Sequence, residues 1–343
     1  MSNADDYIEA LTVSYDADGC ASGIPTYLAD YAEEYARDPH EAAEAWFFAT
    51  HIGLSVNLGL HSLLGKGEDA LLHGELTHEQ YALLTKKFVG TNFNAIDIVE
   101  LAIAAGARYV VCPVTAGDGF SLYNSTCNDY NSVNSAANRD LFGELASTCE
   151  YHGLGLVAEF RFGRNLKRWP DGIPATPEGT AAYVDFMKEQ LHEILTAYGP
   201  IAAVCFSGVA EAAALHPHID FSDLYKMCGM LQPNTLVAFA DAPSIADNDY
   251  YSVHTLDELN ALPEGKPLEM LMTLTPSGRS FDGEQAGKHR KLDAIWEQLR
   301  ACQEAHCNLL INTALMPDGS LDLEDINTLL DVGKRIEKNG LPG

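Results

Sequence analysis

Residues 201–207 read Ile-Ala-Ala-Val-Cys-Phe-Ser, an uninterrupted apolar run that stops at a serine. A run without alternating polar residues is typical of a parallel strand that is covered on both faces. Seven further short runs predict strands, at residues 54–59, 108–114, 155–161, 235–241, 250–254, 268–274 and 308–314. We therefore expect eight strands, joined by helical segments.

The segments between these strands contain recognisable helix starts. Thr77-His78-Glu79-Gln80 has the spacing of a capping box, and Thr176-Pro177 places a proline at a first helical position before a stretch at 181–198. Strands that alternate with helices in this way favour an α/β fold of the (β/α)8 TIM-type barrel class, with an open doubly wound sheet as the alternative. We expect a single barrel domain over residues 41–343 and an acidic N-terminal arm, residues 1–40, packed on the barrel.

The composition is that of a soluble globular protein, with 343 residues, 47% of them hydrophobic and 20% charged. Forty-nine acidic and 21 basic residues give a formal charge of -28, which repels nucleic acids and anionic membranes. No apolar run is long enough to cross a bilayer, and residues 1–6 lack the basic and apolar regions of a signal peptide. We expect a cytoplasmic protein without nucleic-acid or membrane partners; a homo-oligomer is left open.

The cysteines form no Cys-x-x-Cys pair, and several lie in apolar segments: Cys20, Cys112, Cys127, Cys149, Cys205, Cys228, Cys302 and Cys307. Buried free thiols are expected in preference to a disulfide framework. Because no Cys/His spacing resembles a set of metal ligands, we expect no metal site and no cofactor.

Several motifs resemble one known family, in the same order along the chain. Trp46 with residues 51–62 is similar to a first strand that commonly reads Phe-Gly-Leu-Phe-Ile-His-Trp-Gly-x-x-Ser, and 105–109 to the motif Ala-Gly-Ala-Lys-Tyr. The sharpest match is Asn308-Leu309-Leu310-Ile311-Asn312 followed by Pro317-Asp318-Gly319-Ser320. From about Trp46 to about Gly333 the chain resembles the catalytic barrel of the α-L-fucosidase family of glycoside hydrolases. The resemblance implies a (β/α)8 barrel, here without the C-terminal β-sandwich of many relatives, and a small carbohydrate or glycan as ligand.

The chain departs from this family at the positions where the sugar is bound and attacked. The strand that supplies the nucleophilic aspartate ends Trp-Phe-Asp-Gly in the family, and the aspartate position is Ser207 here. A sugar-binding histidine falls on Asn57, and a pair of sugar-binding histidines falls on Ala116 and Gly117. Retaining hydrolysis needs an attacking carboxylate, and its loss costs on the order of 7 kcal/mol of barrier lowering or more. Ordinary fucosidase activity is therefore not expected.

The remaining polar residues at the predicted C-terminal strand ends are the candidates for chemistry. Glu159 and Arg161, spaced i and i+2, point to the same side of their strand, either as a charged pair beside the sugar or as a satisfied ion pair. Asp118, Asp241 and Glu211 are the other candidate acids, and Asp118 could instead fix its loop through backbone hydrogen bonds.

The candidates for ligand binding are Asn57, His61, Arg161, Trp169 and Glu269. Trp169 could stack on a sugar ring or shield the barrel edge. Glu269 matches a glutamate in the family's Trp-Glu-x strand, and it could instead have a structural hydrogen-bonding role. His61 is equally consistent with a capping or core histidine.

Three hypotheses follow from these observations. The first is a carbohydrate-active barrel with altered chemistry, which uses the candidate acids on another glycan. The second is a non-catalytic glycan-binding or regulatory relative. The third is a true glycosidase with a displaced or unusual nucleophile. Burial of Glu159 beneath the pocket floor, with no second acid in reach, would argue against the first.

Overall fold

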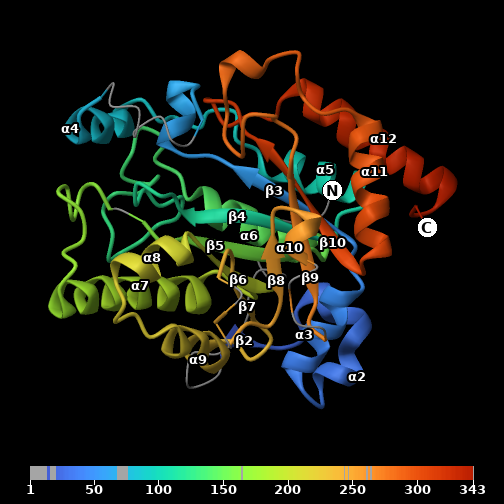
Figure 1. Cartoon of the computed structure of the whole chain (residues 1–343), viewed down its shortest axis with the longest axis horizontal. Helices are drawn as coiled ribbons and strands as arrows, with labels where there is room; N and C mark the ends of the chain where they lie inside the picture. The colour runs from blue at the N-terminus through green and yellow to red at the C-terminus, as the bar shows by residue number, and fades with distance from the viewer. Residues whose placement is uncertain are drawn as a thin grey trace.

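The computed structural model describes residues 14–15, 21–67, 76–163, 165–242, 244–245, 247–259, 262 and 265–342. Its central element is a sheet of eight parallel strands, in the spatial order β7-β6-β5-β4-β3-β10-β9-β8 (Figure 1). Their bounds are β3 Ile52–Asn57, β4 Tyr109–Thr115, β5 Gly155–Arg161, β6 Ala203–Ser207, β7 Leu236–Phe239, β8 Tyr251–Val253, β9 Leu268–Thr273 and β10 Cys307–Ala314. Each strand lies beside its neighbour in sequence, and the last pairs with the first. This cyclic order confirms the predicted (β/α)8 barrel and excludes the alternative, an open doubly wound sheet.

The two strands at the ends of this order, β7 and β8, are joined by the residues that precede β8. Asp249 donates its backbone N–H to Val237 O at 2.8 Å, and its Oδ2 accepts the Val237 N–H at 2.7 Å. Asn248 Oδ1 accepts the Phe239 N–H at 2.6 Å. We call this junction, made by Asn248, Asp249, Val237 and Phe239, the barrel seam. Side chains therefore replace part of the backbone ladder at the point where the barrel closes.

Most strands differ from their predicted bounds by one or two residues at an end, and two of these shifts have a clear cause. The first predicted strand, 54–59, lies at Ile52–Asn57, because Gly59 already begins the 3-10 helix η2, Leu60–Leu64. The fifth, predicted at 235–241, ends at Phe239, and Asp241 adopts a positive φ of 58°, which cannot continue a strand.

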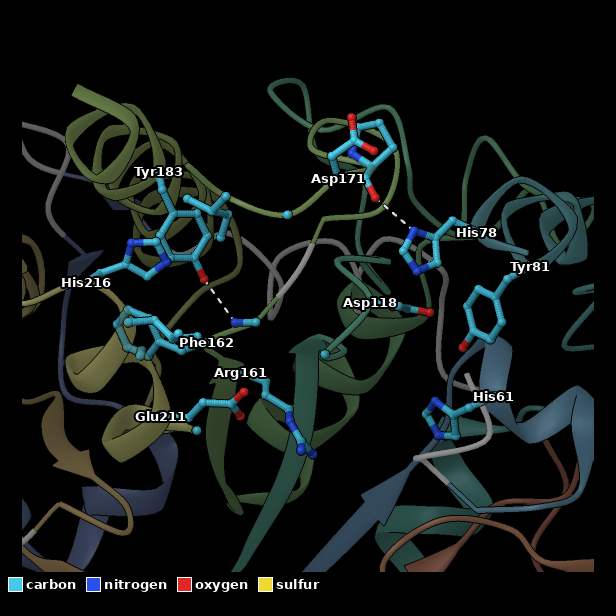
Figure 2. A pocket seen from close by; sticks show the side chains of 18 residues that line it. His61, His78, Tyr81, Asp118, Arg161, Phe162, Asp171, Tyr183, Glu211 and His216 are labelled. Carbon is cyan, nitrogen blue, oxygen red and sulfur yellow. Dashed lines mark hydrogen bonds between the residues drawn. The ribbon is translucent and has the colours of Figure 1, made fainter. Parts of the chain in front are cut away.

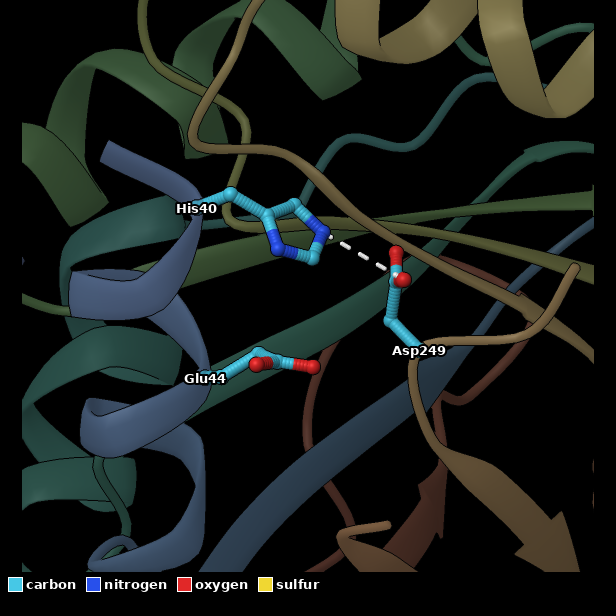
Figure 3. A group of neighbouring side chains, drawn as sticks. All are labelled: His40, Glu44 and Asp249. Carbon is cyan, nitrogen blue, oxygen red and sulfur yellow. Dashed lines mark ion pairs between the residues drawn. The ribbon is translucent and has the colours of Figure 1, made fainter. Parts of the chain in front are cut away.

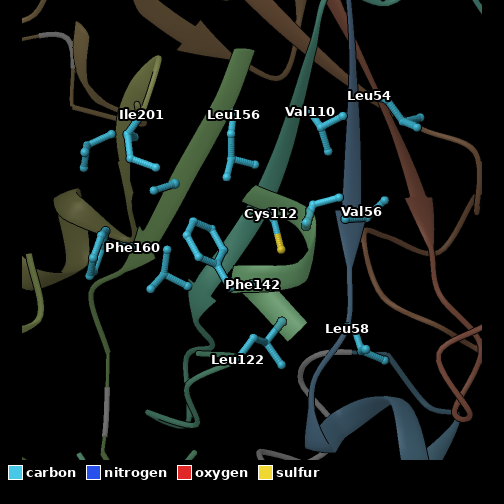
Figure 4. Packing of buried hydrophobic residues seen from close by; sticks show 14 of the residues in the cluster. Leu54, Val56, Leu58, Val110, Cys112, Leu122, Phe142, Leu156, Phe160 and Ile201 are labelled. Carbon is cyan, nitrogen blue, oxygen red and sulfur yellow. The ribbon is translucent and has the colours of Figure 1, made fainter. Parts of the chain in front are cut away.

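Helices cover the outer face of the barrel. They are α5 Ala95–Ala104, α6 Leu141–His152, α7 Pro177–Ala197, α8 Val209–Leu215, α9 Phe221–Leu231, α10 Leu256–Leu259, α11 Leu292–Glu304 and α12 Leu323–Asn339. Leu54, Val110 and Leu156 form one row across β3, β4 and β5 and face the helix layer, where Phe142 of α6 packs (Figure 4). No described helix is both long and apolar enough to pass through a membrane.

Both predicted helix starts are confirmed. In the short helix α4, His78–Ala82, Thr77 Oγ1 accepts the Gln80 N–H at 3.2 Å, and Gln80 Oε1 accepts the Thr77 N–H at 2.9 Å. At α7, Thr176 Oγ1 accepts the Gly179 N–H at 3.1 Å, with Pro177 as the first helical residue. These caps fix the starts of two elements that border the candidate site.

The segment before β3 packs against the N-terminal ends of the strands. It contains β1 Ser14–Tyr15, β2 Ala21–Ser22, the 3-10 helix η1 Thr26–Tyr31, α2 Ala32–Tyr35 and α3 Pro39–Phe48. Trp46 and Phe47 of α3 join Tyr109 and Tyr250 in one buried aromatic cluster, with the Phe47 and Tyr250 ring centroids 4.5 Å apart. Of the predicted arm, residues 1–13 and 16–20 lie outside the described residues, as does Cys20. The seven described cysteines are free thiols.

Candidate functional site

At the C-terminal ends of the strands, an ion pair occupies the lumen of the barrel. Arg279, in the loop after β9, donates Nη1–H to Glu159 Oε1 at 2.7 Å and Nη2–H to Oε2 at 2.5 Å. Ser207 at the end of β6 donates its hydroxyl to Glu159 Oε1 at 2.8 Å. Glu159 is only 4% exposed. Both oxygens of this carboxylate are therefore engaged by protein donors.

The electrostatics of Glu159 follow from this clamp. Burial by itself raises the pKa of the Glu159 carboxyl, but the charge and hydrogen bonds of Arg279, with help from Ser207, outweigh burial and lower that pKa below its usual value. Glu159 is thus a stable carboxylate and a weak base. Glu159 and Arg161 do lie on the same side of β5, as predicted, but the bidentate partner of Glu159 is Arg279 rather than Arg161.

A second polar network fills the other side of the lumen. Asn57 Oδ1 accepts the Ser280 hydroxyl at 3.0 Å and lies 2.9 Å from His61 Nε2. Asn312 Nδ2 donates to Arg279 O at 2.8 Å and so holds the backbone of the arginine loop. The space left among Asn57, His61, Glu159 and Arg161 is about 10 Å³. A cavity of this size holds about one water molecule and no sugar ring.

A much larger pocket, of about 550 Å³, opens beside the lumen (Figure 2). We call it the side pocket. Its aromatic lining comes from Tyr81, Phe162 and Tyr183. Its ionisable lining residues are His61, His78, His216, Arg161, Asp118, Asp171 and Glu211. Apolar walls with a few polar groups are the usual make-up of a small-molecule site.

Hydrogen bonds hold the walls of the side pocket together. His78 Nδ1 lies 2.8 Å from Pro170 O and joins α4 to the loop after β5. Gly163 donates its N–H to the Tyr183 hydroxyl at 3.1 Å, and His216 Nδ1 lies 3.1 Å from Thr180 Oγ1. These bonds join α4, the β5–α7 loop, α7 and the end of α8, and η2 and the loop after β4 complete the lining with His61 and Asp118.

Arg161 reaches the side pocket through space that a missing side chain leaves. A β-carbon at Gly117 would lie 3.2 Å from Arg161 Nε and 3.3 Å from its Cδ. Any side chain at position 117 would therefore press on the arginine in its present position. Gly117 and Arg161, at the end of β5, thus occupy complementary volumes.

The predicted acids separate in the structure. Asp118 lines the side pocket but is 7% exposed, and its Oδ1 accepts the Phe120 N–H at 2.8 Å, in keeping with a role in fixing its loop. Glu211 of α8 is exposed and lines the side pocket. Asp241 Oδ1 accepts the Val209 N–H at 3.3 Å at the start of α8, and Asp241 is not among the residues that line this pocket. Burial raises the pKa of Asp241.

Two predicted ligand-binding residues have structural contacts instead. Glu269 is 2% exposed and accepts hydrogen bonds from Tyr109 Oη at 2.7 Å and Ser252 Oγ at 2.8 Å, below the lumen site. Trp169 packs with its ring centroid 5.8 Å from that of Tyr183 and 5.6 Å from that of Phe186, with Arg168 over its face. Neither residue lines the side pocket.

The sequence patterns did not single out Arg279, Ser280, Tyr81, His78 and Tyr183 as lumen or pocket residues. The position of Arg279 in the loop directly after a predicted strand was a usable signal, because such loops lie at the C-terminal face of a barrel. Tyr81, His78 and Tyr183 lie on helices, where an aromatic or histidine side chain gives no sign of facing a pocket.

Comparisons with known proteins agree on one family. The sequence model of the family Alpha-L-fucosidase matches residues 28–341. Alpha-L-fucosidase 1 of Arabidopsis thaliana is 31% identical over 159 residues, which is 45% of this chain and 30% of that protein. Putative alpha-L-fucosidase 1 of Oryza sativa subsp. japonica is 28% identical over 158 residues. The matched region thus spans about 30% of the length of these curated relatives.

Solved structures share the fold. Alpha-L-fucosidase isoenzyme 1 from Paenibacillus thiaminolyticus has a TM-score of 0.77 at 24% identity and is matched over 88% of this chain and 77% of its own. Alpha-L-fucosidase AlfC from Lactobacillus casei, in complex with alpha-L-fucose, has a TM-score of 0.73 at 22% identity, over 86% of this chain and 98% of its own. The family model covers most of the chain, and the barrel is the fold of these enzymes. This chain belongs to the alpha-L-fucosidase family.

Proposed function

We propose that this chain is a sugar-binding member of the alpha-L-fucosidase family that does not hydrolyse fucosides by the retaining mechanism. One observation carries the proposal: Glu159, the carboxylate beside the nucleophile position Ser207, is buried and clamped by Arg279. This is the arrangement that argues against an altered but working retaining site at the strand ends.

The chemistry of retaining hydrolysis explains why the clamp matters. Two carboxyl groups about 5–5.5 Å apart must flank the scissile bond, one to attack and one to transfer a proton. Ser207 is neutral, and its hydroxyl donates a hydrogen bond to Glu159. The lowered pKa of Glu159 makes it a poor base for activating that hydroxyl. In addition, a lumen space of about 10 Å³ leaves no room for a pyranose at this point.

The side pocket supports the ligand-binding half of the proposal. Its volume of about 550 Å³ suits a mono- or disaccharide, and Tyr81, Phe162 and Tyr183 offer apolar faces for a sugar ring. Arg161, His78 and Glu211 add hydrogen-bonding groups around those faces. A sugar is the ligand class of the family, and the related AlfC binds alpha-L-fucose.

Two measurements test the proposal together. Ligand-observed NMR with a panel of monosaccharides, including L-fucose, is expected to detect binding, and 4-nitrophenyl α-L-fucopyranoside is expected to remain intact at high protein concentration. Arg161→Met should weaken binding by at least tenfold. The matched control Lys167→Met, on an exposed residue outside the pocket lining, should not change it. Hydrolysis by the wild type that Ser207→Ala abolishes would overturn the proposal.

A displaced hydrolytic site is the second candidate, because Asp118, Asp171 and Glu211 all line the side pocket. In that case the wild type hydrolyses an aryl glycoside and Ser207→Ala leaves the rate unchanged. Glu211→Gln, which keeps the shape of the side chain and removes its charge, then abolishes hydrolysis. This pattern would replace our proposal.

A further inference from the structure

A cluster of three ligand-type side chains lies at the opposite end of the barrel from both sites described above. His40 and Glu44 lie one turn apart on α3, and Asp249 belongs to the barrel seam, two residues before β8 (Figure 3). Residues spaced i and i+4 share one face of a helix, a spacing with which a single helix supplies two ligands to an ion. The fold brings the third, Asp249, to them from far along the chain.

Asp249 is held rigidly. Its Oδ2 accepts the Val237 N–H at 2.7 Å, its Oδ1 accepts the Tyr225 hydroxyl at 2.7 Å, and the residue is 4% exposed. These bonds orient Oδ1 toward α3. Hydrogen-bonded partners that orient a ligand group are the usual second layer of a metal site.

The geometry of His40 and Asp249 matches the edge of a coordination tetrahedron. His40 Nε2 lies 3.3 Å from Asp249 Oδ1. Two atoms that are each about 2.0–2.1 Å from a tetrahedral zinc ion lie about 3.3–3.4 Å apart. His40 Nε2 is buried, and its contact with Asp249 Oδ1 is an ion pair that falls short of ideal hydrogen-bond alignment. The nitrogen and the carboxylate oxygen therefore already face each other at a spacing that an ion between them would fit.

We propose that His40, Glu44 and Asp249 bind a divalent transition-metal ion of the zinc class, with water in the fourth position. All three ligand atoms already lie within 4.8 Å of one another. Glu44 is half-buried, and its carboxylate extends from α3 toward the side on which Asp249 lies (Figure 3). An imidazole nitrogen with two carboxylates favours Zn²⁺, Co²⁺ or Ni²⁺ over Mg²⁺ and Ca²⁺, which prefer oxygen ligands alone.

The charge and position of the cluster indicate a structural role for the bound ion. Two carboxylates that face one imidazole concentrate negative charge, and an ion compensates it. Lys266, whose ammonium donates to Asn248 O and whose charge acts on Glu44, lies at the edge of the cluster and competes with the ion. A bound ion would fasten α3 to the barrel seam and so stabilise the fold without taking part in sugar binding.

The test titrates protein that has been treated with a chelator. Zn²⁺ is expected to raise the melting temperature, and Co²⁺ is expected to give the visible absorption bands of a tetrahedral site at a one-to-one ratio. His40→Ala and Glu44→Gln should each weaken Co²⁺ binding by at least tenfold. Lys266→Met should strengthen it. Asp249 is left unchanged, because it closes the barrel seam.

Surface histidines also bind zinc weakly, so the control is His218→Ala, which removes an exposed histidine elsewhere. It should keep the wild-type response. Equal responses of the wild type, His40→Ala and Glu44→Gln would identify adventitious binding only and overturn the proposal, as would the absence of any Co²⁺ spectrum. None of these readouts depends on sugar binding, so this proposal and the proposed function can fail separately.

Discussion

Arg279 holds Glu159 through two hydrogen bonds of 2.7 and 2.5 Å at the C-terminal end of the barrel lumen. The arginine comes from the loop after β9 and the glutamate from the end of β5, so the pair crosses the barrel mouth. The pair makes Glu159, the carboxylate that accepts the Ser207 hydroxyl, part of the protein framework.

Removal of the arginine is expected to destabilise the barrel strongly. Arg279→Met leaves a buried carboxylate without its counter-charge, and the free energy of unfolding should fall by about 3–5 kcal/mol. Urea denaturation at pH 7 measures the change. The double variant Glu159→Gln/Arg279→Met removes both charges and should recover part of the loss. Lys334→Met, which breaks an exposed pair with Asp331, should change the stability by less than about 0.5 kcal/mol. A double variant no more stable than Arg279→Met would contradict this account.

The two buried glutamates are expected to respond to pH with opposite signs. Burial raises the pKa of Glu269, despite the hydroxyls of Tyr109 and Ser252, so its folded state binds a proton more tightly than its unfolded state. Wild-type stability from this residue is present below the unfolded pKa of about 4.3 and decreases as pH rises through the folded value. Glu269→Gln does not titrate, and its stability relative to the wild type should increase with pH.

Glu159→Gln supplies the matched comparison. Because the pKa of Glu159 is lowered in the folded state, its contribution is present above the unfolded pKa and is lost as pH falls through the folded value. The deficit of Glu159→Gln relative to the wild type should therefore grow as pH rises toward neutrality. Urea denaturation of both variants between pH 3 and pH 8 measures the two trends. Trends of the same sign would contradict the opposite pKa shifts assigned to Glu159 and Glu269.

A carboxylate at position 207, where the motif resemblance places the family nucleophile, is not expected to confer fucosidase activity. The Ser207 hydroxyl lies 2.8 Å from Glu159 Oε1, so Ser207→Asp would place two carboxylates in contact. We expect the free energy of unfolding to fall by about 1–3 kcal/mol, because one of them must be protonated or displaced. An assay with 4-nitrophenyl α-L-fucopyranoside should remain negative. Ser207→Ala controls for loss of the hydroxyl, and fucosidase activity in Ser207→Asp would mean that the lumen can still admit a sugar.

Gly117→Ala is expected to disturb the side pocket through Arg161. The new methyl group would lie 3.2 Å from Arg161 Nε, so the guanidinium must shift, and affinity for L-fucose, or for the sugar bound best by the wild type, should decrease several-fold. Gly229→Ala in α9 is the control, since nothing lies within 4 Å of its β-carbon position. That change should leave binding intact and raise the stability by about 0.5–1 kcal/mol. Unaltered binding in Gly117→Ala would argue against Arg161 as a ligand contact.

Local patterns predict local features well in this chain. The capping residues Thr77 and Thr176, and all eight strands, follow from short-range preferences and burial on both strand faces. The alternation along β5 also places Glu159 and Arg161 on one side correctly. The end of β7 was harder to predict. Asp241 follows it with a positive φ, and the hydrophobic pattern of the sequence does not reveal such a backbone conformation.

The local sequence pattern is enough to predict the barrel, because eight buried strands that alternate with helices close in few other ways. The motif resemblance further predicts, at Asn57, Ala116, Gly117 and Ser207, a site that differs from that of the family. The partners of the polar side chains follow from the tertiary structure. Whether Glu159 meets Arg161 or Arg279, and whether His40 meets Asp249, depends on loops and elements that are distant in sequence and are brought together by barrel closure. Long-range side-chain pairing of this kind leaves no periodic trace in the chain, and in this barrel it turns a candidate catalytic acid into a structural ion pair.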